Sequence, residues 1–245
     1  WITSLELSRS ETQEYLKNPP GPIDLIVPRG GDGLIHFVKS HAKCAVLISG
    51  RGNNFLYVHD DADWQKTIPI ILNAKTDKIS ACNALDKVLI NKTIIDLDKK
   101  LKELYHILCE NNVEVLADKN AVLSLPGCSV IGQEEIWSEE FLAMKICIGL
   151  SENMHSAIGK INTHSGGHSV TIMTESMKTA SSFMDQIDSA AVYHNASTRF
   201  TDGGQLGIGA ELAISTDKLH HRGPLGLDQL VTNKWYIYGN GQVRD

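Results

Sequence analysis

The chain has 245 residues, of which 42% are hydrophobic and 21% are charged, a composition typical of a globular protein with a substantial core. It carries 23 Lys and Arg against 29 Asp and Glu, for a net charge of −6, so no basic stripe is available to neutralise a nucleic-acid backbone. No run of 18 apolar residues is present that could cross a membrane. We therefore expect neither a nucleic-acid nor a membrane partner.

The cysteines and the start of the chain bear on where the protein works. The five cysteines are scattered and lack the Cys-x-x-Cys spacing of zinc ribbons, which favours a reducing compartment and no metal site. The chain opens at Trp1 with neither the basic nor the apolar segment of a signal peptide, and without an initiator methionine. We expect a cytoplasmic protein whose given chain begins inside a longer polypeptide.

Predicted strands and helices alternate along the chain, which is typical of an α/β protein with a mostly parallel sheet. The first part predicts a strand at residues 1–7, a helix at 8–17, a strand at 23–27, a helix at 34–42, a strand at 44–50, an alternating strand with an acidic turn at 53–63 and a helix at 63–75. The rest predicts strands at 87–94, 113–118, within 132–150, at 168–175 and at 189–196, and helices at 95–112, 151–165 and 176–188. From residue 197 onward the chain is rich in glycine loops, which we expect to carry function.

One cysteine, Cys82, lies in the stretch TDKISACNALDKVLI (76–90), where a loop is predicted to lead into a helix with Ser80 as its N-cap. The apolar residues that follow have helical spacing: Leu85, Val88 and Leu89. A thiolate at a helix N-terminus is stabilised by the unpaired N–H groups there, and Lys75 and Lys78 lie just upstream. A cysteine between alanines is also commonly a small packing residue, so the local pattern leaves both interpretations open.

Three further loops carry groups suited to binding. The turn PRGGDG (28–33) precedes a helix, so its N–H groups could hold a phosphate, although such turns are common without a ligand. The stretch NTHSGGHS (162–169) places two histidines around a Gly-Gly turn. The stretch NASTR (195–199) follows a predicted strand and suits a small carboxylate or phosphate. None of these loops alone identifies a function.

Taken in order, the segments resemble the γ-glutamyl phosphate reductases, a family of the aldehyde dehydrogenase superfamily. The resemblance is carried by IDLIVPRGG (23–31), NAKTDKISACNAL (73–85), INTHSGGHS (161–169), IMTE (172–175), DSAAVYHNASTRFTDG (188–203), GIGAELAISTDKLHHRGPLGLDQL (207–230) and KWYIYGNGQVR (234–244). It covers essentially the whole chain, with residues 188–244 the most specific part, and implies that the N-terminal part of such an enzyme is missing.

The resemblance implies an aldehyde-dehydrogenase-like fold, with mostly parallel sheets and flanking helices in three αβα layers. It implies NADPH-dependent reduction of L-glutamyl 5-phosphate to L-glutamate 5-semialdehyde and phosphate, a step of proline biosynthesis. Cys82 matches the nucleophile, which would attack the acyl phosphate, expel phosphate and form a thioester. Asn83 and the backbone beside it would stabilise the oxyanion.

The other site residues and the domains also follow from the resemblance. Arg29, Gly30 and Gly31 match the turn that faces the cofactor. The residues implied to bind the substrate are His168, Asn195, Ser197, Thr198 and Arg199. The implied division is 1–72 for the C-terminal portion of the dinucleotide-binding domain, 73–196 for the catalytic domain, and 197–245 for a return segment with substrate and oligomer contacts. A homo-oligomer is expected.

The chain departs from the family pattern in two loops, ISGRGNN (48–54) and DGGQLG (202–207). The family typically reads Gly-His-Ala-Asp-Gly at the first and Asp-Gly-Phe-x-Phe-Gly at the second. Two alternatives therefore stay open. One is a reductase of another acyl phosphate, and the other is a divergent or inactive paralogue that acts as an oligomeric scaffold.

Overall fold

The computed structural model describes residues 3–125, 127–218 and 221–244. The helices are α1 (Arg9–Lys17), α2 (Asp32–His41), α3 (Trp64–Thr76), α4 (Leu97–Glu110), α5 (Met154–His164) and α6 (Met177–Gln186). The strands are β1 (Leu25–Ile26), β2 (Ala45–Val46), β3 (Asn54–Val58), β4 (Leu85–Asn91), β5 (Glu114–Ala117), β6 (Ser129–Val130), β7 (Lys145–Ser151), β8 (Ser169–Met173), β9 (Ala191–His194), β10 (Ala213–Ser215) and β11 (Gly223–Leu225). Short 3₁₀ turns are η1 (Ala121–Ser124), η2 (Glu134–Ser138), η3 (Thr198–Phe200) and η4 (Leu227–Leu230).

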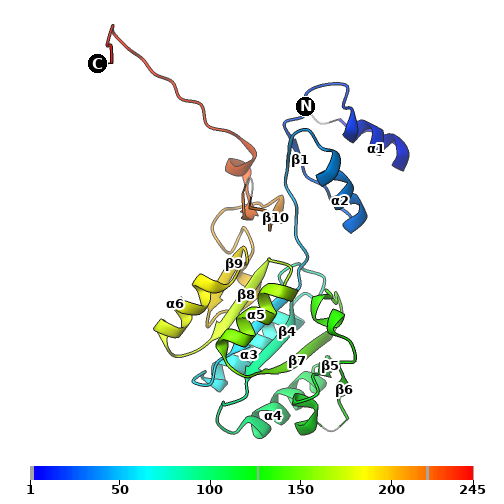
Figure 1. Ribbon diagram of the computed structural model, residues 1–245, viewed down its shortest axis with the longest axis vertical. Coiled ribbons are helices and arrows are strands. Elements are labelled where there is room, and N and C mark those ends of the chain that lie inside the picture. The colour runs from blue at the N-terminus through cyan, green and yellow to red at the C-terminus, as the bar shows by residue number, and fades with distance from the viewer. Residues whose placement is uncertain (1–2, 126, 219–220, 245) are drawn as a thin grey trace.

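Seven strands form one large sheet in the order β6-β5-β7-β4-β3-β8-β9, and all its neighbouring strands are parallel (Figure 1). Helices α3 and α4 pack on one face, and α5 and α6 pack on the other. Crossover helices cover both faces of a parallel sheet, so its strands are buried on both sides. The predicted α/β class and the three αβα layers are confirmed.

The core has two parts, one on each face of the sheet. On one face Leu56 of β3 packs in a cluster with Ile71 of α3 and Leu104 of α4. On the other face Phe55 of β3 lies in a cluster with Phe183 of α6. The strand predicted within 53–63 is confirmed as β3, and every residue of β3 is buried, so the alternation in its sequence does not mark an exposed face. The physical reason is that the helices cover both faces of the strand.

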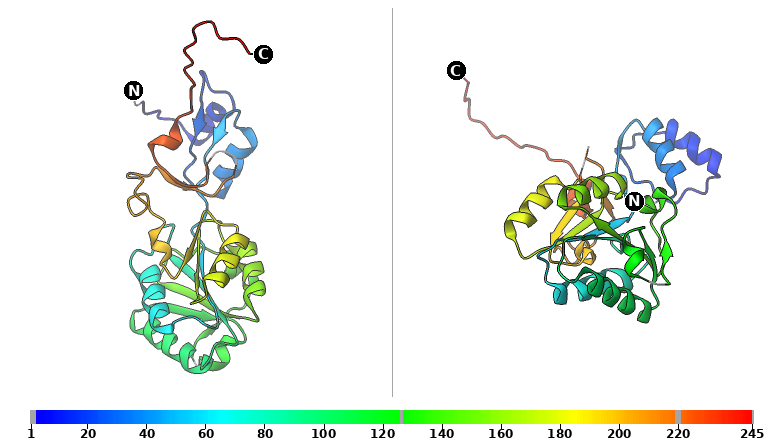
Figure 2. Two further views of the ribbon diagram at one scale, coloured as in Figure 1. Left: turned by 90° about the vertical axis from the view of Figure 1, so that its left-hand side faces the viewer. Right: turned by 60° about the horizontal axis from the view of Figure 1, so that its bottom comes forward.

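A smaller region lies beside the amino edge of the large sheet (Figure 2). It contains α1, α2, the parallel pair β1–β2 and the antiparallel pair β10–β11. The two pairs meet where the N–H of Thr216 donates to the carbonyl of Ile48 at 3.2 Å. Beyond η4, residues 231–244 form an extended segment that runs away from the rest of the molecule (Figures 1 and 2).

Most elements predicted in the chain are confirmed. Six of the seven predicted helices, at 8–17, 34–42, 63–75, 95–112, 151–165 and 176–188, correspond to α1 to α6. The predicted strand at 1–7 is wrong for residues 3–7, which are irregular, and residues 1–2 lie outside the described residues. Helix α1 begins at a capping box, in which Ser8 Oγ accepts from the N–H of Glu11 at 3.4 Å and the Glu11 carboxylate accepts from the N–H of Ser8 at 2.8 Å.

The predicted helix after Cys82 is wrong. Residues 79–83 form turns, and strand β4 begins at Leu85. All seven residues of β4 are buried, because the strand lies inside a sheet that is covered on both faces. A continuous buried run contains apolar residues at helical spacing as well as at strand spacing, so the pattern was ambiguous. Cys82 therefore does not lie at a helix N-terminus, and Ser80 caps no helix.

The large sheet also bears on the predicted domain boundaries. Strand β3 pairs with both β4 and β8 near the centre of the sheet, and α3 packs on the same sheet. The sheet thus includes residues on both sides of the predicted boundary at 72. The three-part division itself stays a prediction. None of the helices in the described ranges is both long and apolar enough to span a bilayer.

Candidate active site

Cys82 lies in a cavity between the amino edge of the large sheet and the smaller region. The cavity has a volume of about 690 Å³. It is lined by Val27, Pro28, Arg29, Ser49, Lys78, Ser80, Ala81, Cys82, Asn83, Arg199, Asp202, Glu211, Leu212, Ala213 and Ile214. Residues far apart in sequence therefore meet around one thiol, as a binding site for a small molecule requires.

The environment of Cys82 raises the pKa of its thiol. Burial contributes most, followed by the negative charges of Glu211 and Glu140. The backbone N–H of Cys82 and the charge of Arg199 act in the opposite direction, and they do not offset the increase. The prediction of a thiolate stabilised by a helix end is therefore wrong, because no helix begins here and carboxylates lie near the sulfur.

The two lysines upstream of Cys82 have different roles. Lys75 is completely buried in α3, and its Nζ lies 2.8 Å from Asp86 Oδ1, so this charge is already neutralised within the core. Lys78 lines the cavity together with Arg29 and Arg199. The positive side of the site therefore comes from Lys78 and the two arginines and not from Lys75.

Asn83 joins the Cys82 turn to η3. Its Nδ2 donates to the carbonyls of Arg199 at 3.2 Å and Thr201 at 3.0 Å, and its Oδ1 accepts from the guanidinium of Arg199. The same guanidinium pairs with Asp77 at 2.9 Å. The amide of Asn83 is thus committed to contacts within the protein, and it holds Arg199 at the wall of the cavity.

The predicted substrate residues are only partly brought together. Thr198 is buried and donates from its Oγ1 to the carbonyl of Asn83 at 2.7 Å, and Ser197 Oγ accepts from the N–H of Arg199 at 3.3 Å. These two residues shape the loop that carries Arg199 and do not line the cavity. Asn195 follows β9 at the opposite, carboxyl edge of the sheet, where its side chain bonds to the backbone of Thr174.

His168 is also outside the cavity. It is completely buried before β8, and burial lowers its pKa to about 4, so the ring is neutral at pH 7. Its Nδ1 lies 2.7 Å from Ser169 Oγ, which in turn lies 2.6 Å from Thr201 Oγ1. Its Nε2 has no hydrogen-bond partner among the described residues. In this structure His168 is a buried support of the sheet edge, without contact to the cavity.

The glycine turn predicted to face a cofactor borders a second hollow. This groove has a volume of about 550 Å³ and is lined by Pro28, Arg29, Gly30, Gly31, Ile35, Ser49, Gly50, Arg51, Glu139, Glu140 and Leu142. Gly31 is the N-cap of α2, a helix of ten residues, so unpaired backbone N–H groups face this turn. Pro28, Arg29 and Ser49 line both the groove and the Cys82 cavity, so the two spaces are neighbours.

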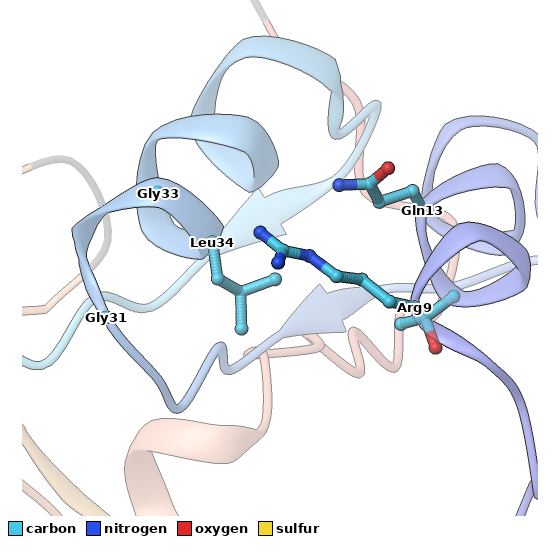
Figure 3. Close-up of a pocket in the computed structure, with 6 residues that line it drawn as sticks. Arg9, Gln13, Gly31, Gly33 and Leu34 are labelled. Atoms are coloured by element: carbon cyan, nitrogen blue, oxygen red, sulfur yellow. The ribbon is translucent and has the colours of Figure 1, made fainter.

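A third hollow, of about 380 Å³, lies between α1 and the start of α2 (Figure 3). Arg9 and Gln13 of α1 face Leu34 of α2 across it, and Gly31 and Gly33 close it (Figure 3). It contains neither a cysteine nor a predicted substrate residue, and only Gly31 is shared with the groove. The chemistry of the site therefore centres on the Cys82 cavity.

The sequence did not single out two carboxylates of the site. A Cβ built on Gly52 would stand 2.6 Å from both the Cα of Cys82 and Oε1 of Glu140, so these two atoms are within about 5.2 Å of each other. Burial raises the pKa of Glu140 and that of Glu211, which lines the cavity. Glu211 belongs to a segment noted for its resemblance, whereas Glu140 lies in a Glu-rich stretch without any local pattern that predicts its place.

Side chains able to bind a metal gather elsewhere. Within the described ranges, His59, Asp60 and Asp61 lie together just after β3, at the carboxyl edge of the sheet. The Nδ1 of His59 is 2.8 Å from Asp61 Oδ1, and both carboxylates are exposed. Exposed acidic groups of this kind are common without an ion, and they lie at the far end of β3 from Cys82.

Known proteins resemble this chain closely in sequence. The γ-glutamyl phosphate reductase of Halothermothrix orenii is 44% identical over 223 residues, which are 91% of this chain and 53% of that protein. The γ-glutamyl phosphate reductase of Idiomarina loihiensis is 44% identical over 244 residues, covering 100% of this chain and 58% of that protein. No family model matches the chain. The chain spans about half the length of the curated relatives it matches.

Solved structures of proteins of known function are also similar to this chain. The crystal structure of γ-glutamyl phosphate reductase from Thermotoga maritima superimposes with a TM-score of 0.90 at 40% identity, covering 97% of this chain and 56% of that one. An acetylating aldehyde dehydrogenase from Geobacillus thermoglucosidasius, at 18% identity and a TM-score of 0.66, covers 97% of this chain and 61% of that one and shares the fold. The fold is therefore aldehyde-dehydrogenase-like, and the chain belongs to the γ-glutamyl phosphate reductase family.

Proposed function

We propose that the protein reduces L-glutamyl 5-phosphate to L-glutamate 5-semialdehyde and phosphate with NADPH, as a step of proline biosynthesis. The observation that carries this proposal is the half-buried Cys82 thiol at the wall of a cavity of about 690 Å³ in a chain of this family. Reduction of an acyl phosphate through a thioester needs a nucleophile that water reaches poorly, because the thioester must survive until it is reduced.

Cys82 carries out the covalent step of the proposed reaction. Its sulfur attacks the carbonyl carbon of the acyl phosphate, the bond to the phosphate oxygen breaks, and the thioester and free phosphate remain. Because the pKa of the thiol is raised, the resting group is protonated at pH 7, and the proton has to leave as the C–S bond forms. The carboxylates of Glu211 and Glu140 are the nearby groups that could accept it, since their own pKa values are raised.

The charges of the cavity suit a glutamyl substrate. Arg29, Lys78 and Arg199 supply positive charge for a carboxylate and a phosphate, while Asp202 and Glu211 supply negative charge for an ammonium group. Asn83, Ser197 and Thr198 hold the loop of Arg199, whereas His168 and Asn195 act only by supporting the surrounding sheet.

The groove beside Arg29 fits the cofactor. Gly30 and Gly31 lie at the N-terminus of α2, where a Cβ on Gly31 would meet no atom within 4 Å, so a phosphate could approach the backbone closely. Arg29 adds a positive charge in the groove and also lines the Cys82 cavity. When bound, NADPH would supply the hydride that reduces the thioester carbonyl, after which the C–S bond would break, releasing the aldehyde and returning Cys82 to a thiol on uptake of a proton. The residues of the chain bind and orient NADPH toward the shared wall of the two spaces.

The assembly and location belong to the same proposal. The side chains of the extended C-terminal segment are strongly exposed, with Trp235 at 87%, Ile237 at 89% and Tyr238 at 93%. An exposed extended segment with large apolar side chains is suited to pairing with a second copy, so we expect a homo-oligomer. The five free cysteines fit a cytoplasmic protein.

The reverse reaction tests the proposal. The intact protein should reduce NADP⁺ when given glutamate 5-semialdehyde and phosphate, and C82A should lose this activity by at least about a thousandfold. Equal rates in both forms would remove Cys82 from the mechanism. Oxidation that does not need phosphate would indicate an aldehyde dehydrogenase, and no rate in either form would favour the scaffold alternative.

A further inference from the structure

Two asparagines, Asn53 and Asn54, come immediately before the apolar run of β3, and both are buried, with exposed fractions of 1% and 0%. They lie in the loop where the sequence departs from the family pattern. A buried amide needs partners for its two N–H groups and its oxygen, so the places where these groups bond show what the residue holds together.

The amide of Asn54 bonds to the turn that carries Cys82. Its Nδ2 lies 2.8 Å from the carbonyl of Gly52, 2.8 Å from that of Cys82 and 2.7 Å from that of Ala84. Its Oδ1 accepts from the N–H of Ser169 at 3.0 Å. One side chain therefore joins the amino ends of β3, β4 and β8 and bonds to the backbone of the residue that carries the thiol.

The orientation of the peptide after Cys82 follows from this contact. In a trans peptide the C=O and the N–H point in opposite directions, so with the carbonyl of Cys82 held by Asn54 the N–H of Asn83 is turned away from Asn54. The next carbonyl, that of Asn83, is held by Thr198 from the other side. Two successive peptide groups beside the nucleophile are thus fixed by side chains, without any helix.

The space around Gly52 makes the fit close. A Cβ at this position would lie 2.2 Å from the carbonyl oxygen of Cys82, so the loop that carries Asn54 and the Cys82 turn touch through their backbones. Loss of the Asn54 hydrogen bonds should therefore displace the Cys82 turn. A displacement of about 1 Å in a reacting group can lower a rate by about a hundredfold.

We propose that Asn54 is a positioning residue for Cys82: its buried amide holds the carbonyls of Cys82 and Ala84 and so fixes the thiol and the N–H of Asn83 toward the substrate. This inference rests on the proposed role of Cys82 as the nucleophile. It also explains how a chain with an altered 48–54 loop keeps its nucleophile in place, since Asn54 supplies the anchoring contacts.

Asn53 provides a matched control. It is the same residue type at the preceding position and is equally buried, but its Nδ2 donates to the carbonyls of Trp137 and His164, each at 2.7 Å. Asn53→Ala therefore removes two hydrogen bonds of a buried amide, against the four contacts of Asn54, without touching the Cys82 turn. A general loss of stability should affect both variants, whereas a loss of position should affect only Asn54→Ala.

The experiment compares N54A, N53A and the parent in the intact protein. We measure the melting temperature, kcat and KM for phosphate-dependent NADP⁺ reduction, and the pH profile of Cys82 alkylation by iodoacetamide, followed on the peptide by mass spectrometry. We expect both variants to melt at a lower temperature than the parent, N54A lower than N53A, because Asn54 makes more hydrogen bonds. We expect kcat of N54A to fall about a hundredfold, while its KM for phosphate stays within about threefold of the parent. The pH profile of Cys82 alkylation should also change in N54A. In N53A we expect kcat, KM and the alkylation rates to stay within about threefold of the parent.

Equal losses of kcat in N53A and N54A, or an N54A variant with the parent's kcat and alkylation profile, would overturn the proposal. If N54A does not fold, N54S keeps one hydroxyl donor and allows the same comparison with N53S. If the parent itself shows no reductase activity, the proposed function fails, and the alkylation profiles still decide whether Asn54 positions Cys82.

Discussion

Two turns of this protein were expected to be alike, and the structure makes them different. The turn Gly30–Gly31 opens a true helix, α2, and its backbone is accessible from the groove. The turn of Cys82 opens a strand, β4, and is enclosed by side chains that bond to its carbonyls. The first turn offers a phosphate the free N–H groups of a helix, whereas the second depends on buried side chains to hold a thiol in place.

The largest expected difference concerns the charge near each turn. Beneath the Cys82 turn, Lys75 is completely buried against Asp86, whereas Arg29 at the glycine turn is exposed. Lys75→Met leaves Asp86 as a buried charge without its partner and should lower the free energy of unfolding by about 3–5 kcal/mol. Arg29→Met should change it by less than about 0.5 kcal/mol. Urea denaturation of both variants measures the difference, and similar losses would contradict the contrast.

The second difference appears on acidification. The pKa of buried His168, near the Cys82 turn, is lowered to about 4. Between its ordinary pKa of about 6.5 and pH 4 the unfolded chain binds a proton there that the folded chain does not. Folding should therefore lose up to about 3 kcal/mol as the pH falls through this window. His168→Asn should flatten this part of the stability curve, and His36→Asn, at an exposed position of α2, should leave it unchanged. Parallel curves for the parent and His168→Asn would argue against a neutral, buried ring.

The third difference is steric. A Cβ on Gly52 would stand 2.2 Å from the carbonyl oxygen of Cys82, whereas one on Gly31 would meet nothing within 4 Å. Gly52→Ala should cost about 1–3 kcal/mol of stability and displace the Cys82 turn, while Gly31→Ala should change stability by less than about 0.5 kcal/mol. Thermal unfolding of the two variants tests this. A stable Gly52→Ala protein would mean that the two loops separate easily.

The smallest expected difference is in thiol reactivity. Burial and neighbouring carboxylates raise the pKa of the Cys82 thiol. Its alkylation by iodoacetamide should therefore be several-fold slower in the folded protein than in the urea-unfolded chain, with both measured at about pH 8 after correction for urea. The rate in the folded protein should keep rising at a pH where the unfolded chain has levelled off. A folded-state midpoint near neutral pH would restore the activated thiolate that the helix pattern predicted.

The sequence predicted some of these features correctly and others wrongly. Helices α1 to α6 and the α/β class were predictable because amphipathic spacing, caps and alternation of elements are local properties. The helix after Cys82 was predicted wrongly, because Leu85, Val88 and Leu89 have helical spacing although they belong to a strand that is buried on both faces. Arg29, Gly30, Gly31, Cys82 and Arg199 came from a resemblance in motif order, and the structure places them around two neighbouring spaces.

The sequence by itself determined that this chain is an α/β protein of the γ-glutamyl phosphate reductase family with Cys82 as its candidate nucleophile. Only the tertiary structure decided what surrounds the thiol. Glu140 and Glu211 approach it from distant segments, and Asn54 and Thr198 bond to the carbonyls beside it. The reason is physical. Burial, charge and hydrogen bonding at a site depend on which strand ends lie side by side, and strand order is set by packing across the whole sheet.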